Sequence, residues 1–306
     1  MKHFLKLIRF QNLLFLAFMQ LVFRFLFLKQ SQIDLALTDF NFFLLVVATV
    51  SIAAGGYVIN NIMDQESDEI NKPQNRVVGL FISESVAYNW YIALTVCGVG
   101  IGFYLSNVIY KPSFASIFVL IATLLYVYAT NLKQIPLLGN IIIALLVALS
   151  ILIIALFDVY PATDLDNKIR MGKAFTILTD YAIFAFLINL IREIIKDLED
   201  IEGDYKTGCN TLAVAIGIQK TKIFVAIITI FSIVILVYYL KISLLDLEYT
   251  IYYALIFILA PLLYFGIKLL NASSSADFHH LSSILKWILF FGVLSVVVIV
   301  LNIKYA

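Results

Sequence analysis

The sequence predicts an all-α membrane protein, and three observations lead to this fold class. Hydrophobic residues make up 62% of the 306 residues and charged residues only 13%, with a mean hydropathy of +0.99, far above the range of soluble domains. Apolar runs recur at about the length needed to cross roughly 30 Å of hydrocarbon. They lack the period-two alternation of a membrane β-barrel, so only helices remain to satisfy the backbone in lipid.

The breaks between the apolar runs support nine transmembrane helices. Turn signals lie at Pro112, Pro136 and Pro161, and a polar loop begins at Asn271. The first run has no small-residue cleavage site and is predicted to be retained as a helix. No linker divides the chain, so we expect one domain over residues 1–306. The predicted helices are, in order, 11–28, 41–63, 87–108, 113–130, 138–160, 173–196, 222–240, 249–270 and 284–303.

Lysine and arginine residues predict the orientation in the membrane. With a cytoplasmic N-terminus, most of the 21 basic residues fall on the cytoplasmic side, as the positive-inside rule requires. We therefore expect an integral protein of the cell membrane with its polar site facing the cytoplasm. Arg24 and Lys29 are predicted to snorkel at the opposite interface.

Charge and cysteine content exclude several other functions. The formal net charge is +1 and neither end carries a charged tail, so nucleic acid is not an expected partner. Cys97 and Cys209 have neither CxxC nor Cys/His ligand spacing, and we expect neither a disulfide nor a zinc site.

Two acidic ladders stand out at the ends of predicted helices. Asn60, Asp64 and Asp68 recur every four residues at the end of the second helix, a spacing that keeps them on one helical face. The sixth helix also ends in an acidic segment. It carries Asp197, Asp200 and Asp204 on one face, and both ladders fall on the same side of the membrane.

Carboxylates that converge near a membrane interface require a compensating cation. Mg²⁺ is the expected cofactor because it prefers oxygen ligands and leaves positions for phosphate and water. The bases predicted on the same side could bind a diphosphate: Arg9, Arg76, Lys133, Arg192 and Lys196. Two other interpretations remain open at this point, a solvated face with helix caps and a transporter with ion-coupling carboxylates.

The ladders resemble the two signatures of the UbiA superfamily of membrane prenyltransferases. Asn60-Asn61-x-x-Asp64-x-x-x-Asp68 resembles the first signature, although Asn61 stands where the family usually has Asp, and Asp200-x-x-x-Asp204 resembles the second. The resemblance implies a nine-helix bundle around a central cavity, Mg²⁺ and diphosphate bound by Asp64, Asp68, Asp200 and Asp204, and a lipid-facing prenyl tunnel.

Further family-like positions suggest substrate contacts. Lys133 and Asn140 match positions near the family's site, and Tyr128 is a candidate for the cavity wall, where an aromatic face would stabilise an allylic cation. The family's basic stretch after the first signature is altered here around Lys72 and Arg76.

The segment from Lys196 to Asp204 is most similar to the digeranylgeranylglyceryl phosphate synthase subfamily. That resemblance implies transfer of a geranylgeranyl group from its diphosphate to the hydroxyl of geranylgeranylglyceryl phosphate, a step of ether lipid synthesis. The alternatives are an aromatic acceptor, as in quinone synthesis, and a membrane transporter.

Overall fold

The structure, a computed structural model, describes residues 1–71, 73 and 76–305. These residues form helices and no β-strand, and nine helical spans are long and apolar enough to cross a membrane, which confirms the predicted fold class. The spans are built from α2 (Phe10–Leu21), α3 (Asp39–Met63), α5 (Glu84–Val108), α6 (Ala115–Thr130), α7 (Leu138–Ile154), α8 (Lys168–Glu199), α11 (Ile218–Ser243), α12 (Glu248–Ala254) with α13 (Ala260–Asn271), and α14 (Ser275–Tyr305).

Local sequence signals set several helix boundaries. Thr38 precedes α3 and its hydroxyl accepts a hydrogen bond from the Asn41 amide at 3.2 Å; Ser83 caps α5 in the same way through the Val86 amide. Such caps satisfy amides that have no partner inside the helix. π-Helical stretches at Val22–Leu28 and Ala155–Val159 extend α2 and α7.

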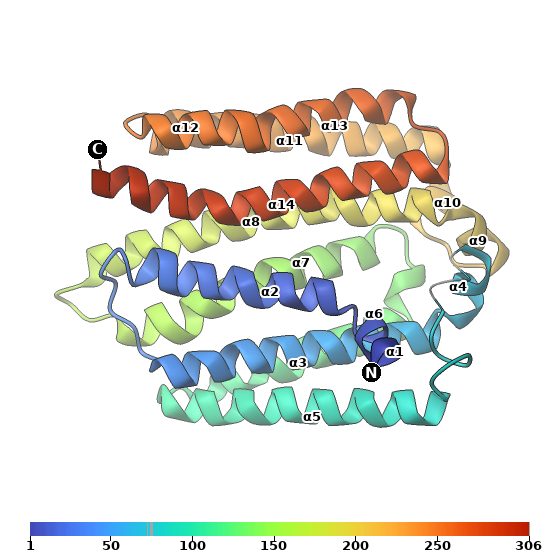
Figure 1. Cartoon of the computed structure of the whole chain (residues 1–306), viewed down its shortest axis with the longest axis horizontal. Helices are drawn as coiled ribbons and strands as arrows, with labels where there is room; N and C mark the ends of the chain where they lie inside the picture. Colours follow the sequence, from blue (N-terminus) through green and yellow to red (C-terminus); the bar gives the residue numbers. More distant parts are fainter. Residues whose placement is uncertain (72, 74–75, 306) are drawn as a thin grey trace.

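The long helices run alongside one another, and four short helices gather at one end of the bundle (Figure 1). These are α1 (Lys2–Leu7), α4 (Gln65–Asn71), α9 (Ile201–Lys206) and α10 (Leu212–Ile216). The acidic ladders therefore lie under this group of short helices, at the end where the N-terminus also lies.

The opposite end holds a buried ion pair that corrects the expectation for Arg24. Arg24 does not snorkel: it is 1% exposed and forms an ion pair with Asp158, which is 0% exposed. Arg24 also donates to the Leu37 carbonyl at 2.7 Å, and the Leu37 amide donates to Asp158 at 3.0 Å. The pair thus ties the connection before α3 to the ends of α2 and α7.

The contact between α3 and α5 depends on a glycine. A Cβ at Gly98 would lie 2.5 Å from Ile52 Cγ1 and 2.9 Å from the Ala48 carbonyl oxygen, whereas a Cβ at Gly100 would meet nothing within 4 Å. We expect Gly98→Ala to destabilise the protein by about 1–3 kcal/mol through overpacking. Gly100→Ala, in the same helix, should leave the unfolding midpoint in detergent unchanged; equal midpoints for the two variants would contradict this packing.

Candidate functional site

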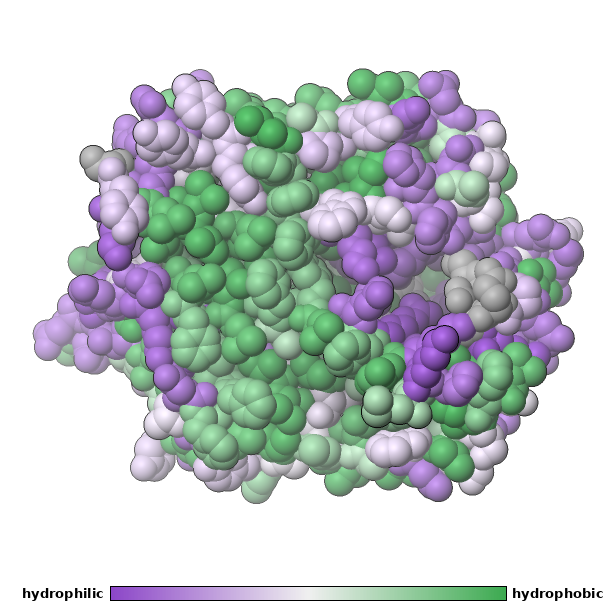
Figure 2. Space-filling model, viewed as in Figure 1, coloured by the Kyte–Doolittle hydropathy of each residue, from purple (hydrophilic) through white to green (hydrophobic). Residues whose placement is uncertain are grey.

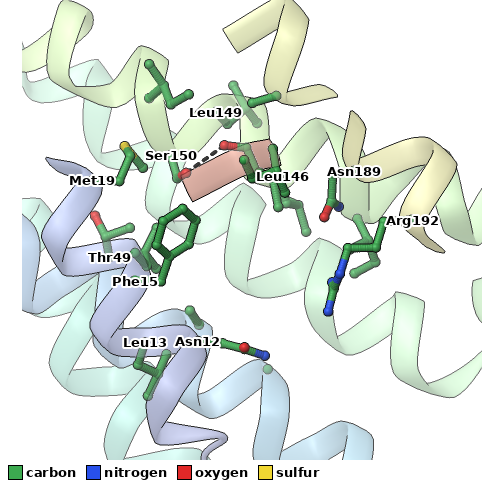
Figure 3. Close-up of a pocket in the computed structure, with 18 of the residues that line it drawn as sticks. Asn12, Leu13, Phe15, Met19, Thr49, Leu146, Leu149, Ser150, Asn189 and Arg192 are labelled. Carbon is green, nitrogen blue, oxygen red and sulfur yellow. Dashed lines mark hydrogen bonds between the residues drawn. The ribbon is translucent and has the colours of Figure 1, made fainter. Parts of the chain in front are cut away.

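A cavity of about 280 Å³ lies inside the bundle. Apolar side chains such as Phe15, Leu146 and Val293 line its body, and Arg9 and Lys286 lie among the charged residues that border it. Figure 3 shows Phe15 and Leu146 facing the space into which Arg192 extends. On the outer surface, Figure 2 shows a hollow bordered by hydrophilic residues toward the end that carries the short helices. The cavity is therefore amphipathic, with a cationic region and an apolar body.

Arg9 occupies the break between α1 and α2. Its φ of 49° lies in the left-handed region, which is uncommon for a residue other than glycine. Its guanidinium lies 5.3 Å from the centre of the Tyr57 ring, and the Tyr57 hydroxyl accepts a hydrogen bond from Asn12 at 3.3 Å. The backbone turn and the ring together hold Arg9 at the cavity.

Helix α8 contributes a polar stripe to the cavity wall. Asn189, Arg192, Glu193 and Lys196 all line the cavity at spacings that share one helical face. Lys196 Nζ lies 2.6 Å from Glu193 Oε1, and Arg192 Nη1 lies 3.4 Å from the same oxygen. Sequence reasoning identified Arg192 and Lys196 but missed Asn189 and Glu193. Polar residues within an apolar span were the available signal.

Both acidic ladders bend where sequence reasoning expected continuous helix. α3 ends at Met63 and α8 ends at Glu199, so Asp64 and Asp200 occupy non-helical junctions before α4 and α9. Asp64 accepts hydrogen bonds from Lys133 at 2.6 Å and from Asn60 at 2.5 Å. Each ladder therefore begins on a membrane helix and continues on a short helix.

Asn71 and Gly203 join the two ladders. The Asn71 side chain donates to the Asp200 carbonyl at 3.0 Å and accepts from the Gly203 amide at 2.9 Å. A Cβ at Gly203 would lie 2.3 Å from Asn71 Nδ2, so this approach requires glycine. Ser67 adds a hydrogen bond to Asp204 at 3.4 Å. The sequence-predicted convergence of the ladders is thus present in the structure.

The carboxylates at this junction are partly buried and act on one another electrostatically. Burial is the largest cause of a pKa of about 6 for Asp204; Lys133 acts to lower this pKa and the neighbouring Asp200 to raise it. Burial and the nearby Asp64 also raise the pKa of Asp68 above its ordinary value. Lys133 responds in the opposite sense: burial alone lowers its pKa, but the charge of Asp64 raises it above its ordinary value. An added cation would relieve the repulsion that these shifts report.

Two other predicted residues, Arg76 and Asp197, lie outside the cavity lining. Arg76 pairs with Glu69 at 2.7 Å. Asp197 accepts a hydrogen bond from Asn140 at 2.9 Å. Tyr128 lines the cavity as expected, and Lys72 lies outside the described residues.

The oxygen-rich junction fits Mg²⁺ in its donor chemistry. The buried Asn60 Oδ1 accepts no hydrogen bond from the described residues. Among the described residues, no group of three or more His, Cys, Asp or Glu side chains is arranged to hold a metal ion by itself. Mg²⁺ needs only one or two carboxylates when phosphate oxygens and water complete its octahedron.

Fold and site together define an integral membrane protein with an amphipathic cavity beneath a group of short helices. The chain belongs to the UbiA prenyltransferase family, whose sequence model matches residues 17–290. The family predicted from the two acidic signatures is thereby confirmed.

Two archaeal relatives illustrate the similarity within the family. The digeranylgeranylglyceryl phosphate synthase of Sulfolobus acidocaldarius is 38% identical over 187 residues, and the chain spans 62% of that protein's length. The synthase of Saccharolobus solfataricus is 33% identical over 239 residues, 76% of each chain.

Solved structures extend the comparison to nearly the whole fold. A structure of digeranylgeranylglyceryl phosphate synthase covers 97% of both chains with a TM-score of 0.62 and 25% identity. A UbiA homolog from Archaeoglobus fulgidus bound to GPP and Mg²⁺ covers 96% of this chain and 99% of its own, with a TM-score of 0.56. At 15% identity the second likeness shows the fold alone.

Proposed function

We propose that this protein transfers a geranylgeranyl group from geranylgeranyl diphosphate to the free hydroxyl of geranylgeranylglyceryl phosphate. The observation that carries the proposal is the amphipathic cavity, whose cationic region adjoins the acidic junction and whose apolar body suits an isoprenoid chain. The similarity to the archaeal synthases supports this acceptor. The distribution of lysine and arginine residues along the chain favours a site on the cytoplasmic side of the cell membrane.

Asp64, Asp68, Asp200 and Asp204 are the proposed Mg²⁺ ligands. Bound there, the metal would act as a Lewis acid that neutralises the leaving diphosphate. The raised pKa of Asp68 and of Asp204 supports this assignment, because burial and neighbouring carboxylates raise both values and a bound cation would offset both effects.

The diphosphate is proposed to lie between the acidic junction and the cationic region of the cavity. Arg9 and Lys133 are the bases whose charges act on Asp68, and they bind the phosphate oxygens with Lys196 nearby. Asn60 orients Asp64 through its hydrogen bond. Arg76 and Asp197 lie outside the cavity and are proposed to support the site indirectly. Arg76 forms an ion pair with Glu69 of α4, and Asp197 accepts a hydrogen bond from Asn140.

In the transfer, the allylic C1–O bond breaks and diphosphate leaves. The acceptor hydroxyl oxygen forms the new C–O bond and loses its proton. Tyr128 and the apolar wall exclude water, which would otherwise capture the allylic carbon. The products are an ether lipid phosphate and inorganic diphosphate.

An acceptor panel tests the function directly. Purified protein with Mg²⁺ and labelled geranylgeranyl diphosphate is offered geranylgeranylglyceryl phosphate, 4-hydroxybenzoate, homogentisate or 1,4-dihydroxy-2-naphthoate, and products are identified by mass. We expect prenylation of the glyceryl phosphate together with Mg²⁺-dependent release of diphosphate. Prenylation of an aromatic compound and not of the glyceryl phosphate would show that the proposed acceptor is wrong. Uptake of the prenyl diphosphate without release of inorganic diphosphate would favour a transporter.

Arg9→Gln tests the diphosphate assignment. Arg9 is proposed to contact only the diphosphate head group of geranylgeranyl diphosphate. In the variant we therefore expect inorganic diphosphate to compete with this substrate about tenfold or more weakly, and geranylgeraniol to compete as well as before. Lys2→Gln, an exposed change in the preceding helix, is the matched control. Equal losses for both competitors in the Arg9 variant would indicate misfolding instead.

A further inference from the structure

Lys286 is a charged residue of the cavity that neither acidic signature contains. It lies within the apolar span of α14, a helix that packs against α8, and it lines the cavity. Among the described residues, the charged neighbour of Lys286 is Arg192, which is also a cation, and no carboxylate forms an ion pair with Lys286. A lysine inside a membrane span without a counterion indicates a functional site.

Two other residues that line the same cavity, Asn189 and Arg192, have buried hydrogen-bond donors without an acceptor among the described residues. These donors are Arg192 Nε and Asn189 Nδ2. Asn189 is only 4% exposed, so water does not readily take the place of a missing acceptor. The two residues are three positions apart on α8 and both line the cavity (Figure 3).

The local charge points to an anion. Glu193 lies 2.6 Å from Lys196 and 3.4 Å from Arg192, so the two cations share one carboxylate. With Lys286, the three cations and one carboxylate leave a net charge of two positive units facing one cavity. A phosphate monoester carries about −1.5 to −2 charges at neutral pH and presents three acceptor oxygens. Its charge and its acceptors match this net charge and the spare donors.

Arg192 lies one helical turn farther from the acidic junction than Lys196, the base of α8 proposed to contact the diphosphate. Arg192 precedes Asp200 by eight residues, which corresponds to roughly 12 Å along a helix that rises 1.5 Å per residue. Arg9 and Lys133 act to lower the pKa of Asp68, whereas Arg192 contacts Glu193 on the side of Lys196 away from the junction. One anion bound at the acidic junction would therefore not satisfy Arg192 and Lys286.

We propose that Asn189, Arg192 and Lys286 bind the phosphate monoester of the acceptor lipid. The proposal rests on the proposed function and deepens it, because it assigns the two phosphorylated substrates to separate anion sites. In geranylgeranylglyceryl phosphate four covalent bonds join the reacting hydroxyl oxygen to the phosphorus, a span of about 5 Å. Phosphate binding at α8 and α14 would thus hold the hydroxyl on the side of the cavity toward the acidic junction.

Lys286→Met tests the site with two acceptors that differ only in the phosphate. With geranylgeranylglyceryl phosphate we expect the KM for the acceptor to rise at least tenfold, while the KM for geranylgeranyl diphosphate changes less than twofold. With the dephosphorylated alcohol, geranylgeranylglycerol, the variant and the unchanged protein should have equal kcat/KM. A rise in the diphosphate KM, or equal losses with both acceptors, would overturn the assignment.

A binding measurement without the donor separates this inference from the proposed reaction. Geranylgeranylglyceryl phosphate should raise the unfolding midpoint of the unchanged protein and of Lys220→Met, an exposed control on the same side. It should not raise the midpoint of Lys286→Met or of Arg192→Gln, and inorganic phosphate should compete. If no acceptor were prenylated but this pattern held, the anion site would stand without the proposed reaction. Equal stabilisation of all four proteins would exclude the site.

Discussion

Asp64→Asn and Asp200→Asn should each abolish prenyl transfer, with a loss of about a thousandfold or more in kcat. Both residues occupy the junctions where a membrane helix passes into a short helix, and each belongs to the proposed Mg²⁺ ligand set. An amide keeps the size of the carboxylate but removes its charge, so the metal would be weakly held or misplaced beside the leaving group. Single-turnover assays with saturating geranylgeranyl diphosphate measure the loss.

The fold should survive both changes. The Asp200 contact with Asn71 uses the backbone carbonyl, which the substitution retains. Glu66→Gln is the matched control because Glu66 lies two residues after Asp64 and its side chain is exposed. Near-normal transfer by both Asp variants at saturating Mg²⁺ would refute the metal assignment.

Asp158→Ala should produce the largest loss of stability at the opposite end of the bundle. It would leave the buried Arg24 guanidinium with Asp39, a 59% exposed partner at 3.1 Å, in place of its buried counterion, and the Leu37 amide without its Asp158 acceptor. Removing one partner of a buried ion pair costs about 3–5 kcal/mol. Unfolding of the purified protein in mixed micelles of increasing SDS content measures the difference in free energy.

An exposed ion pair nearby supplies the comparison. Arg170 and Asp34 lie 2.5 Å apart with side chains that are 50% and 52% exposed, and such surface pairs contribute about 0–1 kcal/mol. Asp34→Ala should therefore change the free energy of unfolding by less than about 1 kcal/mol. Similar losses for Asp34→Ala and Asp158→Ala would contradict the importance of the buried pair.

The membrane class, the nine spans and the two acidic ladders could all be predicted from the amino-acid sequence. Hydrophobic run length and four-residue spacing are local properties, and the lipid environment leaves helices as the structure for such runs. The expected spans agree closely with the structure; for example, the run at 41–63 corresponds to α3, Asp39–Met63. The signatures around Asp64 and Asp200 also sufficed to identify the family.

Which polar groups come into contact depends on the packing of helices that are distant in the sequence. Lys133 lies 69 positions from Asp64 in the chain, yet the two form an ion pair. Arg24 was expected at an interface and is instead buried with Asp158 on another helix. Lys286 joins Arg192 at the cavity only because α14 packs beside α8. Periodicity fixes the face that one helix presents, but burial and charge partners depend on the neighbouring helices, which no local pattern specifies.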